Sequence, residues 1–195
     1  MMGAILSFFV LVAVSVRYEF SQHFRVPAAE AFRWCTDYSP TDHALMGLKG
    51  HRKSTRLSHD TIMLDDTIFS GGKGVRKKKL IRTDPNRMTY YNFHLTGPTK
   101  HSLYFYQIVP DGEGESRLDY TAYEVTYPKK APTKIQLAGM AAAEAVNWRR
   151  EWGNLAKAME KELRGKREAQ LASSFRSTLT RIRICYTGRS CAVGG

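Results

Sequence analysis

Two adjacent aspartates and one histidine are the residues whose types best suit acid–base chemistry. Asp65 and Asp66 adjoin in an apolar run, and a strand there points one carboxylate inward and the other outward. His94 shares its parity with Asn92, so both can face one interior. Proton transfer needs an inward acid and base within hydrogen-bond reach. Our catalytic candidates are therefore Asp66, His94 and Tyr106, with an ion-paired or solvated aspartate as the alternative.

The basic run RKKK at residues 76–79 lies on the next expected strand. Because side chains alternate along a strand, this run forms no single basic patch. Lys77 or Lys79 can instead point inward and pair with Asp65 or Asp66 on the adjacent strand. A purely solubilising role for the run is the alternative.

Aromatic side chains gather in the last three expected strands and in the C-terminal helical segment. They can line a cavity or fill it as ordinary core, and the sequence leaves both possibilities open. A buried phenol needs a hydrogen-bond partner, so several inward tyrosines indicate water or a polar ligand group beside them. The candidate ligand-binding residues are Phe32, Tyr90, Tyr104, Tyr106, Tyr120, Trp148, Trp152 and Met159.

The sequence contains no motif for a metal, a nucleotide or a hydrolytic triad. The segment GGKG at 71–74 stands between two strands and indicates a hairpin rather than a phosphate-binding loop. The cysteines, at positions 35, 185 and 191, lack metal-ligand spacing, and the other histidines lie on exposed parities or near turns. We expect no metal and no fixed cofactor. Cysteine use favours a reducing, cytoplasmic compartment.

Periodicity predicts the elements that must position these residues. Residues 16–26 alternate as a half-buried strand, and two short helices follow, the first opened by Pro27 and the second closed by Gly47. Short runs separated by turn signals then predict an antiparallel meander. These runs are residues 51–58, 61–70, 75–83, 87–96, 102–109 and 116–127.

The stretch 132–163 predicts one long helix, with Pro132 in its first turn and Gly165 as its C-terminal cap. Its expected apolar stripe is Ile135, Ala138, Ala142, Ala145, Trp148, Trp152, Leu155, Met159 and Leu163. One helix about 10 Å across cannot fill the concave side of a seven-stranded sheet. We therefore expect an apolar cavity between the sheet and the helix.

Length and composition place the chain among globular proteins. Its 195 residues are 43% hydrophobic and 25% charged, which excludes a disordered chain and a polytopic membrane protein. Residues 1–15 form an apolar extension too short for a spanning helix, and a signal, a weak anchor or a misplaced start would explain it. Membrane association or export through this segment is the alternative to a cytoplasmic location. Residues 166–195 are basic and indicate a mostly disordered tail.

The order of elements resembles the helix-grip fold of the SRPBCC superfamily, which includes START proteins, birch-pollen allergens and polyketide cyclases. The segment YEFSQHFRVPAAEAFRWCTDY, with Phe32 and Trp34 in an F-x-W pattern, is similar to the opening strand and helix of that family. VPDGEGESRLDYTAYEV resembles its last hairpin, and EWGNLAKAMEKEL resembles the end of its long helix. The resemblance covers residues 16–165. It implies an α+β fold: a curved seven-stranded antiparallel sheet wrapped around a long C-terminal helix, with two short helices after the first strand.

The resemblance also implies a function, the binding or transport of a hydrophobic or amphipathic small molecule such as a lipid or polyketide, more often without catalysis. One alternative is an enzyme of the cyclase or dehydratase type that uses Asp, His and Tyr groups in the cavity. A second is a basic module that binds RNA or an anionic membrane, since the net charge is +12. A small-molecule ligand is the expected partner, an anionic membrane surface is a further one, and nucleic acid is disfavoured.

Overall fold

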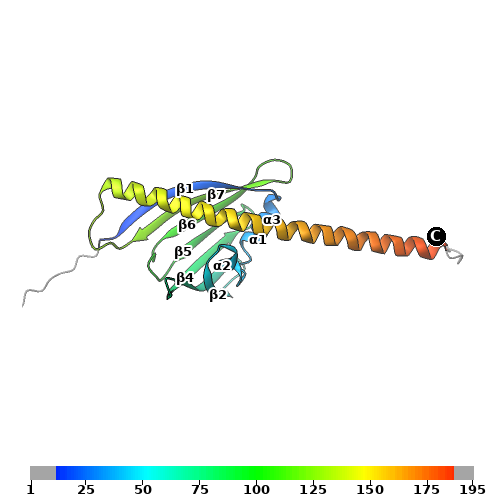
Figure 1. Ribbon diagram of the computed structural model, residues 1–195, viewed down its shortest axis with the longest axis horizontal. Coiled ribbons are helices and arrows are strands. Elements are labelled where there is room, and N and C mark those ends of the chain that lie inside the picture. The colour runs from blue at the N-terminus through cyan, green and yellow to red at the C-terminus, as the bar shows by residue number, and fades with distance from the viewer. Residues whose placement is uncertain (1–11, 187–195) are drawn as a thin grey trace, which may run out of the picture.

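A seven-stranded antiparallel sheet curves around one long helix (Figure 1). The structure is a computed structural model that describes residues 12–186, with side chains placed for all of these except residues 70 and 174–186. The strand order is β1-β7-β6-β5-β4-β3-β2. The elements are β1 (Val14–Phe24), α1 (Ala28–Cys35), α2 (Asp42–Leu45), β2 (Lys49–Arg56), β3 (Thr61–Ser70), β4 (Lys73–Asp84), β5 (Thr89–His94), β6 (Leu103–Pro110), β7 (Ser116–Thr126) and α3 (Lys134–Tyr186). This arrangement confirms the expected helix-grip fold.

The sheet is a meander in which the chain's first and last strands pair. β1 lies antiparallel to β7, with Phe20 opposite Tyr120. The first and the last strand of the chain are therefore neighbours in the sheet, and α3 packs against β1. Gly71 and Gly72 both have positive φ, 56° and 78°, and join β3 to β4 in a tight hairpin. Two-residue hairpins of this kind require that left-handed backbone. The GGKG segment is therefore a hairpin, as expected.

Alternation along the strands decides which side chains face α3. In β6, Tyr104, Tyr106 and Ile108 are buried while their neighbours Leu103 and Phe105 are exposed on the outer face. β7 alternates in the same way. The resulting core is one cluster that joins β1, β5, β6 and β7 to α1 and the middle of α3. A smaller cluster joins Tyr38, before α2, to Ile62 and Leu64 of β3 and Ile81 of β4.

The inward face of α3 differs from the expected stripe toward the N-terminal end of the helix. At about 100° per residue, Ile135 lies about 140° around the helix from Trp148, whereas Leu137 lies within about 20° of it. Ile135 is accordingly 85% exposed, and Leu137 packs against the core. Ala138 and Ala142 are exposed as well, and Met140 and Ala141 take their place. The expected stripe, built from steps of three and four, was therefore wrong over the first turns of the helix.

The C-terminal end of α3 was also predicted wrongly. We expected a cap at Gly165 and a disordered tail after it, but the helix continues to Tyr186. A C-terminal cap glycine needs a left-handed backbone, whereas Gly165 is helical and no atom lies within 4 Å of its Cβ position. A glycine inside a helix costs only about 1 kcal/mol relative to alanine, and the Lys, Arg, Glu, Ala and Gln residues that follow favour helix. Residues 166–186 are thus helical, and 187–195 lie outside the described residues.

At the other end, β1 begins at Val14, two residues before the expected start. The expected N-terminal extension falls mostly on residues 1–11, which lie outside the described residues. Within residues 12–186, no helix combines the length and the apolar character needed to cross a membrane.

Candidate functional site

Two adjoining hollows lie between the concave face of the sheet and α3. The first, which we call the aromatic pocket, has a volume of about 80 Å³. The second, the charged chamber, has a volume of about 360 Å³. Met46, Arg52, Lys79 and Trp148 line both, so the two hollows meet along these side chains. Small-molecule sites usually measure roughly 300–1,000 Å³, so the two together are large enough for a ligand.

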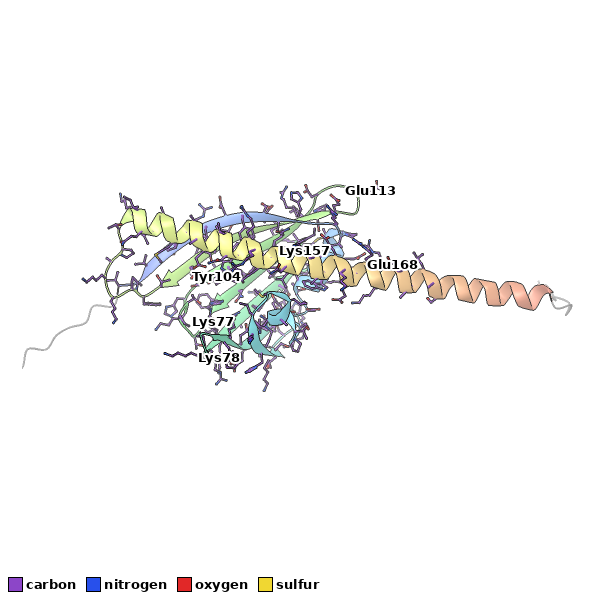
Figure 2. All side chains as sticks on the ribbon, in the orientation of Figure 1. Lys77, Lys78, Tyr104, Glu113, Lys157 and Glu168 are labelled. Carbon is purple, nitrogen blue, oxygen red and sulfur yellow. The ribbon has the colours of Figure 1, made fainter. Side chains whose placement is uncertain are left out.

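Aromatic rings from the sheet and from α3 form the walls of the aromatic pocket. Tyr90 and Tyr106 stack with their ring centroids 4.3 Å apart and their planes within 6°. Trp152 of α3 closes on Tyr106 with a centroid distance of 5.8 Å. Trp148 lies 5.7 Å from Tyr104 and marks the passage to the charged chamber. Figure 2 shows Tyr104 on the sheet close beside α3. The pocket is thus flat-sided, with the π faces and edges of several rings around it.

Four polar atoms of the aromatic pocket are buried without a hydrogen-bond partner among the described residues. They are the hydroxyls of Tyr38 and Tyr90, Oδ1 of Asn92 and Nε1 of Trp152. A buried donor or acceptor left unpaired costs about 1–3 kcal/mol, and native proteins contain few of them. Burial raises the pKa of both tyrosines well above the usual value, so both remain neutral hydroxyl donors. The pocket therefore presents hydroxyl, indole and amide groups to whatever occupies it.

Beside the pocket lies the fully buried carboxylate of Asp66, which, unlike the four atoms above, has several hydrogen-bond partners. Arg52 donates to it twice, from Nε to Oδ1 at 2.8 Å and from Nη2 to Oδ2 at 3.2 Å. Lys79 donates to Oδ2 at 2.6 Å, and Arg52 also pairs with Asp42 of α2. We call Asp42, Arg52, Asp66 and Lys79 the charged cluster. Its two cations and two acids satisfy one another.

The strand register brings this cluster together. Asp66 is opposite Arg52 across the β2–β3 pair, and the β3–β4 pair sets Asp66 opposite Lys77, two residues from Lys79. Asp66 and Lys79 point inward, whereas Asp65 points outward and pairs with Arg76. The expected inward lysine that pairs with an aspartate is therefore present as Lys79 and Asp66.

The ionisation of the two cluster acids differs. Burial alone would raise the pKa of Asp66, but His43, Arg52 and Lys79 outweigh it and hold that pKa well below its usual range. Burial instead raises the pKa of Asp42 to about 6, with the charge of Arg52 only partly opposing the rise. Asp66 is therefore a fixed anion, and Asp42 is the member of the cluster that can change its charge near neutral pH.

Two residues of this region were missed by the sequence analysis. His43, taken as near a turn, is only 2% exposed, and its Nε2 lies 3.6 Å from Oδ2 of Asp66. Arg52 lies in the run HRKSTRLS, whose unbroken polarity gives no sign of which side chains turn inward. Only the pairing register with Asp66 reveals its place in the cluster.

His94 lies in the wall of the charged chamber, as does the buried carboxylate of Glu124. The Nδ1 atom of His94 is 2.7 Å from the hydroxyl of Thr99, and its ring centroid is 4.7 Å from that of Tyr104. Burial and the neighbouring charges of Lys79 and Lys77 lower the pKa of His94 to about 2, so the ring is neutral. Glu124 accepts hydrogen bonds from Tyr104 and from Tyr18.

The candidate residues from the sequence fall into three groups. Tyr90, Tyr106, Trp148 and Trp152 line the aromatic pocket. Tyr104 and His94 line the charged chamber together with Trp148, while Asp66 lies behind the two cations that line it. The remaining candidates, Phe32, Tyr120 and Met159, are buried in the core cluster and line neither hollow.

The geometry suits binding better than proton transfer. Asp66 is saturated with donors, and a carboxylate whose pKa is lowered is a weak base. Burial raises the pKa of Tyr106, so its phenol is a weak acid. Within the part of the chain described, no group of three or more His, Cys, Asp or Glu side chains is arranged to hold a metal ion.

Comparison with known proteins finds relatives by structure only. No family model matches the sequence, and no curated protein matches it. The protein TTHA0849 from Thermus thermophilus superposes with a TM-score of 0.57 at 15% identity, over 73% of this chain and 96% of that one. The ZhuI aromatase/cyclase from Streptomyces sp. R1128 gives 0.62 at 11% identity, over 77% and 96%. The protein Ara h 8.0201 gives 0.53 at 14% identity, over 73% and 99%.

At such identities the likeness concerns the fold. The superpositions cover 73–77% of this chain, which includes most of the sheet and its helices. The chain thus has the helix-grip fold, which these solved structures share with it.

Proposed function

We propose that the protein binds an amphipathic small molecule, such as a lipid or a polyketide, between the sheet and α3, and that it does so without catalysis. The observation that carries this proposal is the set of four unpartnered polar atoms around the aromatic pocket, counted over the described residues. A ligand with a flat apolar body and oxygen substituents would contact the rings and pair with those atoms. Apolar contact would supply most of the affinity, at about 25 cal/mol per Å² buried.

The charged cluster supports the same proposal from the other side. Arg52 and Lys79 line both hollows but already hold Asp66 and Asp42, so they form a fixed polar wall rather than mobile side chains. A rigid wall reduces the ordering cost of binding. The polar end of a ligand would therefore lie toward Arg52 and Lys79, and its flat apolar body against the rings of Tyr90 and Tyr106.

A titration with 1-anilinonaphthalene-8-sulfonate, a flat aromatic anion that fluoresces in apolar sites, tests this proposal. The matched variants are Tyr90→Phe and Tyr91→Phe, which remove the same hydroxyl from neighbouring residues on opposite faces of β5. We expect Tyr90→Phe to raise the dissociation constant of the probe about fivefold, because one hydrogen bond is lost. Tyr91→Phe should leave the constant unchanged. Equal constants for both variants and the wild type would place the probe elsewhere and contradict the proposal.

The catalytic alternative, a cyclase or dehydratase, has less support. It needs an acid and a base that can exchange a proton, whereas the pKa of His94 is lowered to about 2 and Asp66 is held as an anion. If the chain were such an enzyme, His94→Ala would abolish turnover of a polyketide substrate while leaving probe binding intact. Retention of full turnover in that variant would exclude His94 from the reaction.

A further inference from the structure

The C-terminal part of α3 projects beyond the sheet. Residues 164–186, which we call the α3 extension, continue the helix past the edge of the sheet for about 33 Å (Figure 1). Figure 2 shows Lys157 on the part of α3 that lies over the sheet and Glu168 on the part that projects. Every residue from 164 to 173 is exposed, including Leu171 at 62%. Nothing in the described part of the domain therefore covers this stretch of helix.

The base of the extension is braced against α1. Arg167 pairs with Glu30 at 2.8 Å, and Lys166 pairs with Glu162 at 2.6 Å. Glu162 also accepts a hydrogen bond from Nε1 of Trp34 at 3.0 Å. The contacts of Arg167 with Glu30 and of Glu162 with Trp34 thus join the base of the extension to α1.

Apolar residues recur along the extension at helical spacing. The sequence has Leu171, Phe175, Leu179, Ile182 and Tyr186, at steps of four, four, three and four. In a helix these positions fall within an arc of about 80°, a lengthwise stripe on one face. Such a stripe normally packs against a core or another apolar surface.

The extension is strongly basic. The sequence of residues 164–186 contains Arg164, Lys166, Arg167, Arg176, Arg181 and Arg183, against one acid, Glu168. No acidic residue follows Glu168, and Lys166 and Arg167 already have partners at the base. The distal half therefore combines an apolar stripe with arginines that no acid within it can neutralise.

We propose that the α3 extension binds the surface of an anionic lipid bilayer, with the stripe embedded at the interface and the arginines among the headgroups. An amphipathic basic helix is the form that lies in a membrane interface, and anionic headgroups complement its charge. RNA would attract the same arginines but would offer the stripe no apolar surface. This inference rests on α3 alone and does not depend on what fills the cavity.

The test is sedimentation of the full chain with vesicles of phosphatidylcholine alone or mixed with phosphatidylglycerol. The variant Leu179→Glu puts a negative charge into the stripe, and the matched control Ser177→Glu puts the same charge on the opposite side of the helix. We expect binding to the anionic vesicles that weakens with salt. We also expect Leu179→Glu to weaken that binding about tenfold more than Ser177→Glu, because only the first removes an embedded side chain.

Three results would overturn the proposal. Equal losses in the two variants would show that charge alone acts and that the stripe does not enter the bilayer. Equal binding to neutral and anionic vesicles, unchanged in either variant, would place the contact elsewhere in the chain. Tighter binding to single-stranded RNA than to anionic vesicles, equally reduced in both variants, would assign the extension to nucleic acid. Equal thermal unfolding of both variants and the wild type would confirm that the domain is intact in each.

Discussion

The charged cluster and the aromatic pocket are neighbouring sets of buried polar groups that differ in one respect. In the charged cluster, every charge has a partner: Asp66 is held by Arg52 and Lys79, and Arg52 also holds Asp42. In the aromatic pocket, Tyr90 and other polar groups have none among the described residues. The first set is satisfied within the protein, and we propose that a bound ligand satisfies the second. Substitutions should therefore affect stability in the cluster and binding in the pocket.

The largest effect is expected from Asp66→Asn, which leaves Lys79 and one side of Arg52 buried without a counter-charge. Breaking a buried ion pair in this way costs about 3–5 kcal/mol. The matched control is Asp65→Asn, one residue away, where the partner Arg76 is exposed and the loss should be several-fold smaller. Urea unfolding of both variants measures the difference. Similar free energies of unfolding would mean that the cluster is not the structural unit described here.

A smaller effect, with a distinct pH dependence, is expected from Asp42. Its folded pKa is raised to about 6, so the folded state holds a proton that the unfolded state has already lost. The free energy of unfolding should therefore fall as the pH rises from about 4 to about 6, by up to about 3 kcal/mol in total. Asp66 affects the free energy of unfolding in the opposite sense, because its pKa is lowered in the folded state. Its contribution to stability is lost only when the pH falls below the ordinary pKa of an aspartate.

The variant Asp42→Asn isolates this contribution, since an amide does not titrate. Urea unfolding between pH 4 and pH 6 should show a flatter profile in the variant than in the wild type. An unchanged slope would mean that Asp42 keeps its ordinary pKa because its pair with Arg52 fully offsets the effect of burial.

The smallest effect on stability is expected in the aromatic pocket. There the sign of the change in the free energy of unfolding shows whether the hydroxyl of Tyr90 has a partner. Tyr90→Phe removes a buried hydroxyl that has no partner among the described residues. The unliganded protein should therefore become more stable by about 1 kcal/mol, even though the ligand is bound more weakly. Thermal unfolding of ligand-free samples measures the gain. A loss of stability would indicate that the hydroxyl already has a partner.

The sequence was most informative where alternation is clean. The alternating pattern of the strands predicted the meander, and the residue range 61–70 is that of β3. It could not choose between Asp65 and Asp66, or between Tyr90 and Tyr91, because adjacent residues of one type leave the parity open. The pairing of β3 with β2 and β4 makes the choice between the aspartates in the structure.

Long-range contacts explain the rest of what was missed. His43 is buried because α2 folds onto β2, which no local pattern near residue 43 shows. Phe32, Tyr120 and Met159 were expected at the cavity but lie in the solid core, since the sequence predicts an inward side chain without showing whether space remains beside it. The length of α3 was underestimated because a glycine in an exposed helix ends it only when the backbone turns left-handed there.

Native mass spectrometry of the protein purified from its own cells tests whether the hollow beneath α3 holds a ligand. We expect a retained small molecule that is released on unfolding, bears oxygen substituents on an apolar body, and is present at lower occupancy in Tyr90→Phe than in Tyr91→Phe. Two results together would contradict ligand binding in this hollow. The wild-type protein would carry no such molecule, and any molecule it took up from a cell extract would bind equally well to Tyr90→Phe.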